Sequence, residues 1–309
     1  MSARSSTPLT DKLRDATLDL LWRQWRALGG AAAGGPTSTQ VDLEVLCLAS
    51  LALDAFEPRL WVAMADWIRG GSSLVSVQRL KNLSAAFPDA APLLADLRQV
   101  ALLEARDARW KALGTVKARR GDPLRRAMIR PRSAGPDIQN GPALMLRMRA
   151  VFGVSLKADL TALLLGIQEH TTVSAAAASL GYSTPAVFRA LQDLHAAGLA
   201  SVSDAGPAAQ YWMNPGAWET LLGGRQAIAP WSHWLERVGY ACAAIAWESR
   251  LKRGSVSDYA RAAGLRSVVD AHRPSLARAL GIHTSVPDTA DTKVWADFHS
   301  TLAKQIEVR

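Results

Sequence analysis

Residues 172–203 read TVSAAAASLGYSTPAVFRALQDLHAAGLASVS and carry the strongest structural signal in the chain. Ser174 is expected to cap a short helix whose small alanines let another helix cross closely, and Gly181 ends it. After a tight turn, Ser183 can cap a second helix that begins Thr184-Pro185. Apolar residues then recur at spacings of four and three, which predicts a helix with one buried face: Val187, Leu191 and Leu194.

The flanking residues extend this pattern in both directions. Before it, residues 142–152 predict a helix with Leu144, Met145, Met148 and Val151 facing inward and Arg147 and Arg149 facing outward, and Ser155 can cap a further helix. After it, residues 200–204 and 210–213 read as two short strands joined by a turn at 205–207. Helix, helix, turn, helix and β-hairpin in this order predict a winged helix-turn-helix.

At this point residues 172–203 resemble the winged helix regulators of the MarR type. The ending Leu191-x-x-Leu194-x-x-x-Gly198-Leu199 is especially similar. The resemblance covers about a quarter of the chain and implies that residues 183–194 form a recognition helix lying in a major groove. Its outward residues would then read bases: Thr184, Phe188 beside a thymine methyl, Arg189 on guanine and Gln192 on adenine. Each is equally compatible with an ordinary exposed helix position.

Charge is distributed unevenly along the chain. The segment expected to form the winged helix has few of the basic residues that a DNA-binding module needs. Residues 150–224 contain two basic and five acidic side chains, a net charge of −3, and the wing tip at 204–209 has no Lys or Arg. Residues 117–149 contain nine basic and two acidic side chains, a net charge of +7. We therefore expect the preceding basic segment to track the phosphate backbone. The expected backbone contacts are Ser183, Arg119, Arg120, Arg125, Arg126, Arg130, Arg132, Arg147 and Arg149.

The chain as a whole predicts a mainly α fold in four segments. Residues 1–116 form an N-terminal helical domain, punctuated by Gly29-Gly30 and Gly70-Gly71. Residues 117–141 are a proline- and arginine-rich linker or arm, and residues 142–222 are the winged helix-turn-helix with its small β-hairpin. Residues 223–309 form a C-terminal helical region suited to dimerisation. The eleven tryptophans lie mostly within apolar helical patterns, which is typical of core anchors.

A second resemblance concerns the first eighty residues. The phrases LRDATLDLLWRQWRALG, DLEVLCLASLALDAFEPRLWVAMADWI and LVSVQRLKNL are similar to bacterial helical proteins encoded beside nucleotidyltransferase-like toxins. This implies an antitoxin-like or autoregulatory protein with a partner encoded nearby. In that alternative, the acidic winged helix and the Trp-rich helices bind a protein partner such as the toxin, a role that can coexist with repression.

Several function classes find no signal in the sequence. There is no phosphate-binding loop, no nucleophile elbow and no His or Cys pair at metal-ligand spacing. Asp42 and Glu44 read as structural residues on exposed helix faces. We expect neither an enzyme nor a bound cofactor or metal.

No apolar run is long enough for a membrane span, and the first fifteen residues do not read as a secretory signal. Cys47 and Cys242 read as reduced core residues. The expectation is a cytoplasmic, homodimeric regulator that binds double-stranded DNA, most simply as a repressor of its own operon.

Overall fold

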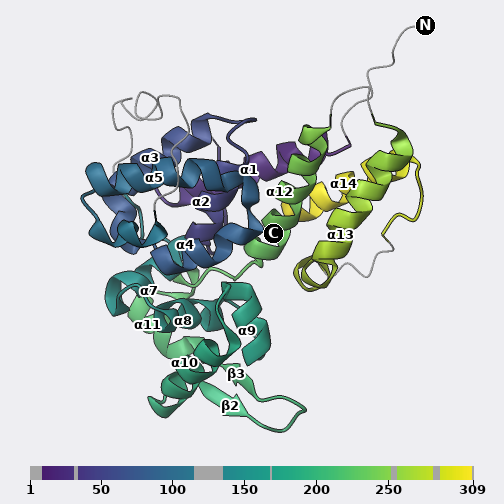
Figure 1. The fold of residues 1–309 in the computed structure, drawn as a ribbon. Helices are drawn as coiled ribbons and strands as arrows, with labels where there is room; N and C mark the ends of the chain where they lie inside the picture. The colour runs from purple at the N-terminus through teal and green to yellow at the C-terminus, as the bar shows by residue number, and fades with distance from the viewer. Residues whose placement is uncertain are drawn as a thin grey trace, which may run out of the picture. The chain divides into compact units, whose positions relative to one another are not determined.

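A computed structural model describes residues 9–30, 34–114, 135–167, 169–251, 256–280 and 286–307. The chain divides into two compact units. One is Trp22–Leu235, and the other combines Met1–Leu21 with Glu236–Arg309. The structure is mainly helical with one small antiparallel sheet, as predicted for the fold class (Figure 1). The helical segment before residue 114 and the segment after residue 135 belong to the same unit, whereas composition alone separates them.

The unit that joins the two chain ends is built from helices. These are the first part of α1 (Asp11–Ala27), most of α12 (Trp234–Arg250), α13 (Asp258–Leu280) and α14 (Thr292–Glu307). Buried aromatic residues fill its core, among them Tyr240 and Trp295. The Glu248 carboxylate accepts hydrogen bonds of 2.8 Å from the backbone N–H groups of Leu9 and Thr10. An acidic side chain therefore satisfies donors near the start of α1.

The first half of the larger unit is a cluster of short helices. Its α-helices are α2 (Leu43–Ala52), α3 (Arg59–Gly71), α4 (Val77–Leu83) and α5 (Ala91–Leu103), with 3₁₀ turns η1 (Ser72–Leu74), η2 (Ser84–Ala86), η3 (Pro88–Ala90) and η4 (Ala108–Leu113). Fully buried tryptophans anchor this core, as the apolar pattern predicts, and two of them also donate hydrogen bonds. Trp25 bonds the Ser50 hydroxyl and Trp67 bonds the Leu28 carbonyl, each at 3.0 Å.

The second half carries the sheet. In chain order it contains η5 (Gly141–Ala143), α7 (Leu144–Phe152), α8 (Leu156–Ile167), β1 (Thr171–Thr172), α9 (Val173–Leu180), α10 (Thr184–Ala196), β2 (Ser201–Ser203), β3 (Gln210–Trp212), α11 (Pro215–Leu222) and η6 (Arg225–Ala227). The strand order is β1-β3-β2, and both pairings are antiparallel. Tyr211 lies opposite Thr171 on one side and Val202 on the other. Because Tyr211 is buried, the sheet packs against the same apolar core as α8 and α10.

Three local details differ from the sequence prediction. Strand β1 is additional, since two residues are too short to leave a periodic signal. Thr172 caps α9 in place of Ser174, because its hydroxyl accepts a hydrogen bond from the N–H of Ala175 at 3.2 Å. Val151 was expected to face inward but is 70% exposed. It lies in the last turn of α7, where Gly153 ends the helix with a positive φ.

Two expectations concern the cysteines and membrane-spanning helices. Cys47 and Cys242 are both buried and neither is in a disulfide, as predicted. No helix within the described residues is long and apolar enough to cross a membrane.

Candidate functional site

The outer face of α10 holds the four residues predicted to read bases. Thr184, Phe188, Arg189 and Gln192 are all exposed, while Val187, Ala190, Leu191 and Leu194 are buried beneath them. Residues 184, 188 and 192 are spaced by four, so they lie along one helix face, and Arg189 lies beside them. Helix α10 thus presents a continuous polar strip with one aromatic ring, Phe188, of which 45% is exposed.

The turn before α10 has a defined geometry. Gly181 has a φ of 68°, a left-handed conformation that favours glycine, and its N–H bonds the Ala177 carbonyl. Ser183 stands at the N-cap of α10 and is exposed, with no side-chain hydrogen bond to the helix. Its predicted contact with a phosphate stays a prediction.

Cations are scarce on this face. Arg189 is the single Arg or Lys of α10, and its Nε donates a hydrogen bond to the Pro185 carbonyl at 3.3 Å. Lys157 on α8 pairs with Asp193 of α10 at 2.8 Å. The exposed turn between β2 and β3 contains Asp204 and no basic residue. The described surface around α10 therefore supplies little of the charge that duplex DNA requires.

The arginines predicted to contact the DNA backbone divide into three groups. Arg119, Arg120, Arg125, Arg126, Arg130 and Arg132 lie outside the described residues. Arg147 is half-buried and donates from Nη2 to the Leu222 carbonyl at 3.1 Å. The prediction that Arg149 faces outward is wrong, because only 1% of it is exposed and its guanidinium is held in ion pairs.

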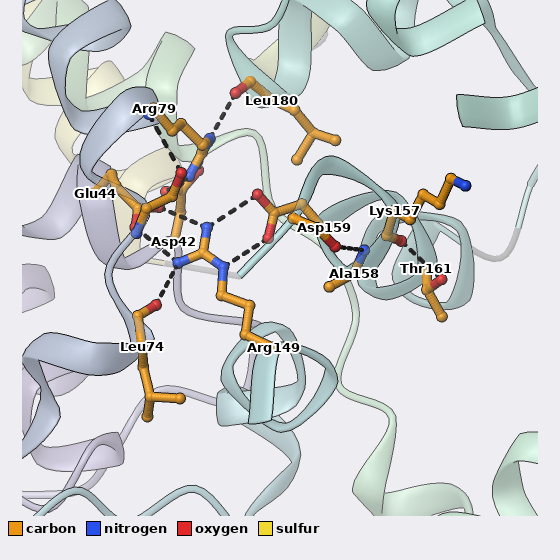
Figure 2. A network of polar contacts seen from close by, with 12 residues as sticks. Asp42, Glu44, Leu74, Arg79, Arg149, Lys157, Ala158, Asp159, Thr161 and Leu180 are labelled. Atoms are coloured by element: carbon orange, nitrogen blue, oxygen red, sulfur yellow. Dashed lines mark hydrogen bonds and ion pairs between the residues drawn. The ribbon is translucent and has the colours of Figure 1, made fainter. Parts of the chain in front are cut away.

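Arg149 belongs to a buried charge cluster formed by Asp42, Glu44, Arg79, Arg149 and Asp159 (Figure 2). All five side chains are fully shielded from solvent. Arg149 donates from Nε to Asp159 Oδ1 and from Nη1 to Glu44 Oε1, both at 2.7 Å. It therefore joins α2, α7 and α8, which lie in the two halves of the larger unit.

Arg79 forms the second half of the cluster, reaching it from α4. Its Nη1 and Nη2 donate to the two oxygens of Asp42 at 2.5 Å, and Nη1 also donates to Glu44 Oε2 at 2.7 Å. Its Nε donates to the Leu180 carbonyl at the end of α9, at 2.6 Å. Planar guanidinium groups suit such bidentate pairing, and the fixed geometry is specific to arginine.

The two acidic residues at the start of α2 respond differently to burial. For Asp42, desolvation outweighs the attraction of Arg79 and raises the pKa of the carboxyl. For Glu44, desolvation also raises the pKa, but the charges and hydrogen bonds of Arg149 and Arg79 outweigh it and lower the pKa to about 2. Glu44 touches both guanidinium groups and also accepts a hydrogen bond from the Ser76 N–H at 2.8 Å. It is therefore the charged centre of the cluster.

A hollow of about 440 Å³ lies elsewhere in the larger unit, beside β3 and α11. His170 stacks on Trp212 with ring centroids 4.4 Å apart, and the rim carries Glu169, Glu219 and Arg225. Glu169 and Arg225 are exposed and Glu219 is half-buried, so the hollow offers no buried charged group of the kind that a specific ligand site uses. In the part of the chain that the structure describes, no group of three His, Cys, Asp or Glu side chains could hold a metal ion.

Comparison with protein-family models, with curated proteins and with solved structures finds no match to this chain. The assignment of the site therefore rests on its geometry.

Sequence reasoning found the α10 face but missed the buried cluster. Asp42 and Glu44 were expected on exposed helix faces, yet both are fully buried. One signal was present: two acidic residues lie on either side of the first residue of an otherwise apolar segment, LEVLCLASLA. A charge at such a position requires a buried partner, but the partners are 35 and 105 residues away along the chain.

Proposed function

We propose that residues 142–222 are a winged helix-turn-helix and that the chain is a transcriptional regulator that binds double-stranded DNA through α10. The order α7, α8, β1, α9, α10, β2, β3 supports this, because the hairpin follows the helix-turn-helix and β1 pairs with β3. The resemblance of residues 172–203 to MarR-type regulators supports the same reading. No catalytic or cofactor role enters the proposal.

The single observation that carries the proposal is the exposed face of α10. Thr184, Phe188, Arg189 and Gln192 project from a helix whose opposite side is buried, next to a left-handed glycine turn. Arginine and glutamine are the side chains that pair bidentately with guanine and adenine in a major groove. A helix of 13 residues spans about 20 Å, enough to cross the groove.

Affinity in this proposal comes from the basic segment that precedes the module. Residues 117–134 lie outside the described residues, so their contribution is argued from charge alone. Each neutralised phosphate releases counterions, so binding should weaken steeply as salt rises. Replacing Arg125 and Arg126 together with alanine should flatten that salt dependence by about two charges. An unchanged slope would remove this segment from the interface.

The test is a mobility-shift titration of the full chain on the DNA upstream of its own gene and on a random duplex, at two salt concentrations. Selective, salt-sensitive binding is expected.

Arg189→Ala should weaken binding to the upstream duplex about tenfold or more and weaken binding to the random duplex far less. Arg59→Ala is the matched control, since its side chain is 78% exposed on α3, where it pairs with Glu57 and lies over the Trp22 ring. Equal losses for both variants, or non-selective wild-type binding, would refute base reading by α10. Sedimentation of the complex is expected to give two protein copies per duplex.

A second candidate function is binding of a protein partner encoded nearby, of the nucleotidyltransferase-toxin class. An exposed apolar group favours it: Val151, Phe152 and Leu221 are 70%, 49% and 74% exposed. Phe152 packs edge-on against Trp218 at 6.2 Å, and Leu221 lies three residues further along α11. Co-expression with the neighbouring gene product tests this candidate. A stable complex that Leu221→Asp disrupts, without any DNA, would support it, and recovery of the two proteins as separate species would exclude it.

A further inference from the structure

The end of α9 is tied to the helical half of the same unit. The Arg79 Nε, on α4, donates a hydrogen bond of 2.6 Å to the carbonyl oxygen of Leu180, the last residue of α9. Carbonyls in the last turn of a helix lack partners within that helix, and a cation there also interacts favourably with the helix dipole. Arg79 supplies both the donor and the charge.

Two further contacts hold the residues that follow. A Cβ added to Gly181 would lie 2.2 Å from Leu83 Cδ2, so α4 packs directly against the glycine backbone. The Tyr182 hydroxyl donates to Asp159 Oδ2 at 2.9 Å, and Asp159 is in turn held by Arg149. Every residue between α9 and the N-cap of α10 is thus adjacent to, or bonded to, the buried cluster or α4.

The cluster leaves Arg79 little freedom to move. Both terminal nitrogens are engaged by Asp42 and Glu44, so the Nε points at Leu180 as a consequence of the same fork geometry (Figure 2). A guanidinium can donate in three directions within one plane, whereas a lysine ammonium at the end of a flexible stem cannot reproduce this arrangement.

We propose that Arg79 is a positioning residue that fixes the turn between α9 and α10, and through it the direction in which the α10 face is presented. The role of the α10 face in this statement rests on the proposed DNA-binding function, but the fixing of the turn does not. In consequence, residues 42–83 are part of the reading module and not a separate domain attached to it.

The test measures the turn directly by hydrogen exchange of the full chain, without DNA. Arg79→Lys keeps the charge and should accelerate exchange about tenfold in peptides covering residues 180–190. Arg149→Lys is the matched control: it is equally buried in the same cluster, but it donates to Glu44, Asp159 and Leu74 and reaches the turn only indirectly, through Asp159 and the Tyr182 hydroxyl. Arg149→Lys should accelerate hydrogen exchange in α7 and α8 more than in residues 180–190. Equal patterns in the two variants, or an unchanged turn in Arg79→Lys, would overturn the proposal.

If Arg79→Lys does not fold, Asp42→Asn replaces the oxygen that accepts from Arg79 Nη2 and so loosens the same guanidinium, and the same local acceleration is expected. A turn that stays protected in Asp42→Asn then counts against the proposal. DNA binding forms a separate arm. On a duplex selected by the wild type from a random library, Arg79→Lys should lose selectivity about tenfold while binding to random duplex stays within about twofold. Wild-type protein that binds no DNA would refute the proposed function alone, because the exchange result stands independently.

Discussion

The Arg79 guanidinium on α4 and the Leu180 carbonyl that ends α9 are joined by a 2.6 Å hydrogen bond between segments 101 residues apart. The same guanidinium neutralises Asp42 and Glu44. One side chain therefore serves two purposes: it compensates buried charge, and it holds the end of α9, next to the turn that leads into α10. Since burying an unpaired charge is strongly unfavourable, the two purposes cannot be separated by small movements.

Asp42 and Glu44 should tolerate neutralisation unequally. Glu44→Gln should lower the free energy of unfolding by about 3 kcal/mol, because it leaves Arg79 and Arg149 short of a carboxylate and places an amide N–H₂ against a donor. Asp42→Asn should lower the free energy of unfolding by about 1 kcal/mol less than Glu44→Gln does, since burial raises the pKa of Asp42 and disfavours its charged form. Urea denaturation followed by tryptophan fluorescence measures both. A larger loss in Asp42→Asn would contradict the assignment of Glu44 as the charged centre.

The cap of α9 distinguishes the structure from the sequence prediction. Thr172→Ala should destabilise the larger unit by about 1 kcal/mol, because its hydroxyl accepts the Ala175 N–H. Ser174→Ala should change stability by less than about 0.5 kcal/mol, since Ser174 is exposed within the helix. Thermal or urea unfolding of both variants decides between them, and the reverse order of effects would restore Ser174 as the cap.

Two helical glycines in the unit that joins the chain ends should respond oppositely to alanine. Gly239 on α12 has open space around an added Cβ, so Gly239→Ala should stabilise by about 0.5–1 kcal/mol through helix propensity. An added Cβ at Gly264 on α13 would lie 1.8 Å from the Trp247 ring. Gly264→Ala should therefore destabilise by about 1–3 kcal/mol through overpacking, despite the same gain in propensity. Matching melting temperatures for the two variants would show that Trp247 does not pack on α13.

His299 should make this unit sensitive to mild acid. Its Nδ1 faces the Leu9 carbonyl at 3.2 Å, so Nδ1 carries the proton and Nε2 accepts from the Tyr240 hydroxyl at 2.8 Å. Burial lowers the pKa of His299 from 6.5 to about 4, so the folded chain keeps it neutral while the unfolded chain protonates it. Its contribution to stability is complete above pH 6.5 and is lost as the pH falls toward 4.

The variant His299→Gln isolates that effect. Glutamine can donate to Leu9 and accept from Tyr240 without titrating. Between about pH 7.5 and about pH 5, the wild type should lose about 2 kcal/mol more unfolding free energy than the variant. Denaturant titrations at the two pH values measure the difference. Parallel pH dependence of the two proteins would mean that His299 titrates normally in the folded state.

Local patterns in the sequence were sufficient for most of the helices and for the α10 face. Val187, Leu191 and Leu194 repeat at helical spacing and are buried, which leaves Thr184, Phe188 and Gln192 exposed on the other side. The left-handed turn at Gly181 was also predictable, because glycine adopts that conformation with no steric penalty. Both features depend on residues a few positions apart, and such interactions are encoded locally.

Orientation of charged side chains was not predictable in the same way. Arg147 and Arg149 lie two residues apart on one short helix, and both were expected to face outward. Arg149 is buried instead, because the core contains two carboxylates, Glu44 and Asp159, to which it donates hydrogen bonds. Likewise, the local sequence around Asp42 and Glu44 is that of surface residues, and only the pairing of both with Arg79 of α4 explains their burial. What the sequence determined by itself is therefore the helices, their apolar faces and the turn before α10. Only the tertiary structure decided which charges are buried, because pairing over 35 to 105 residues depends on how the chain packs and leaves no periodic trace.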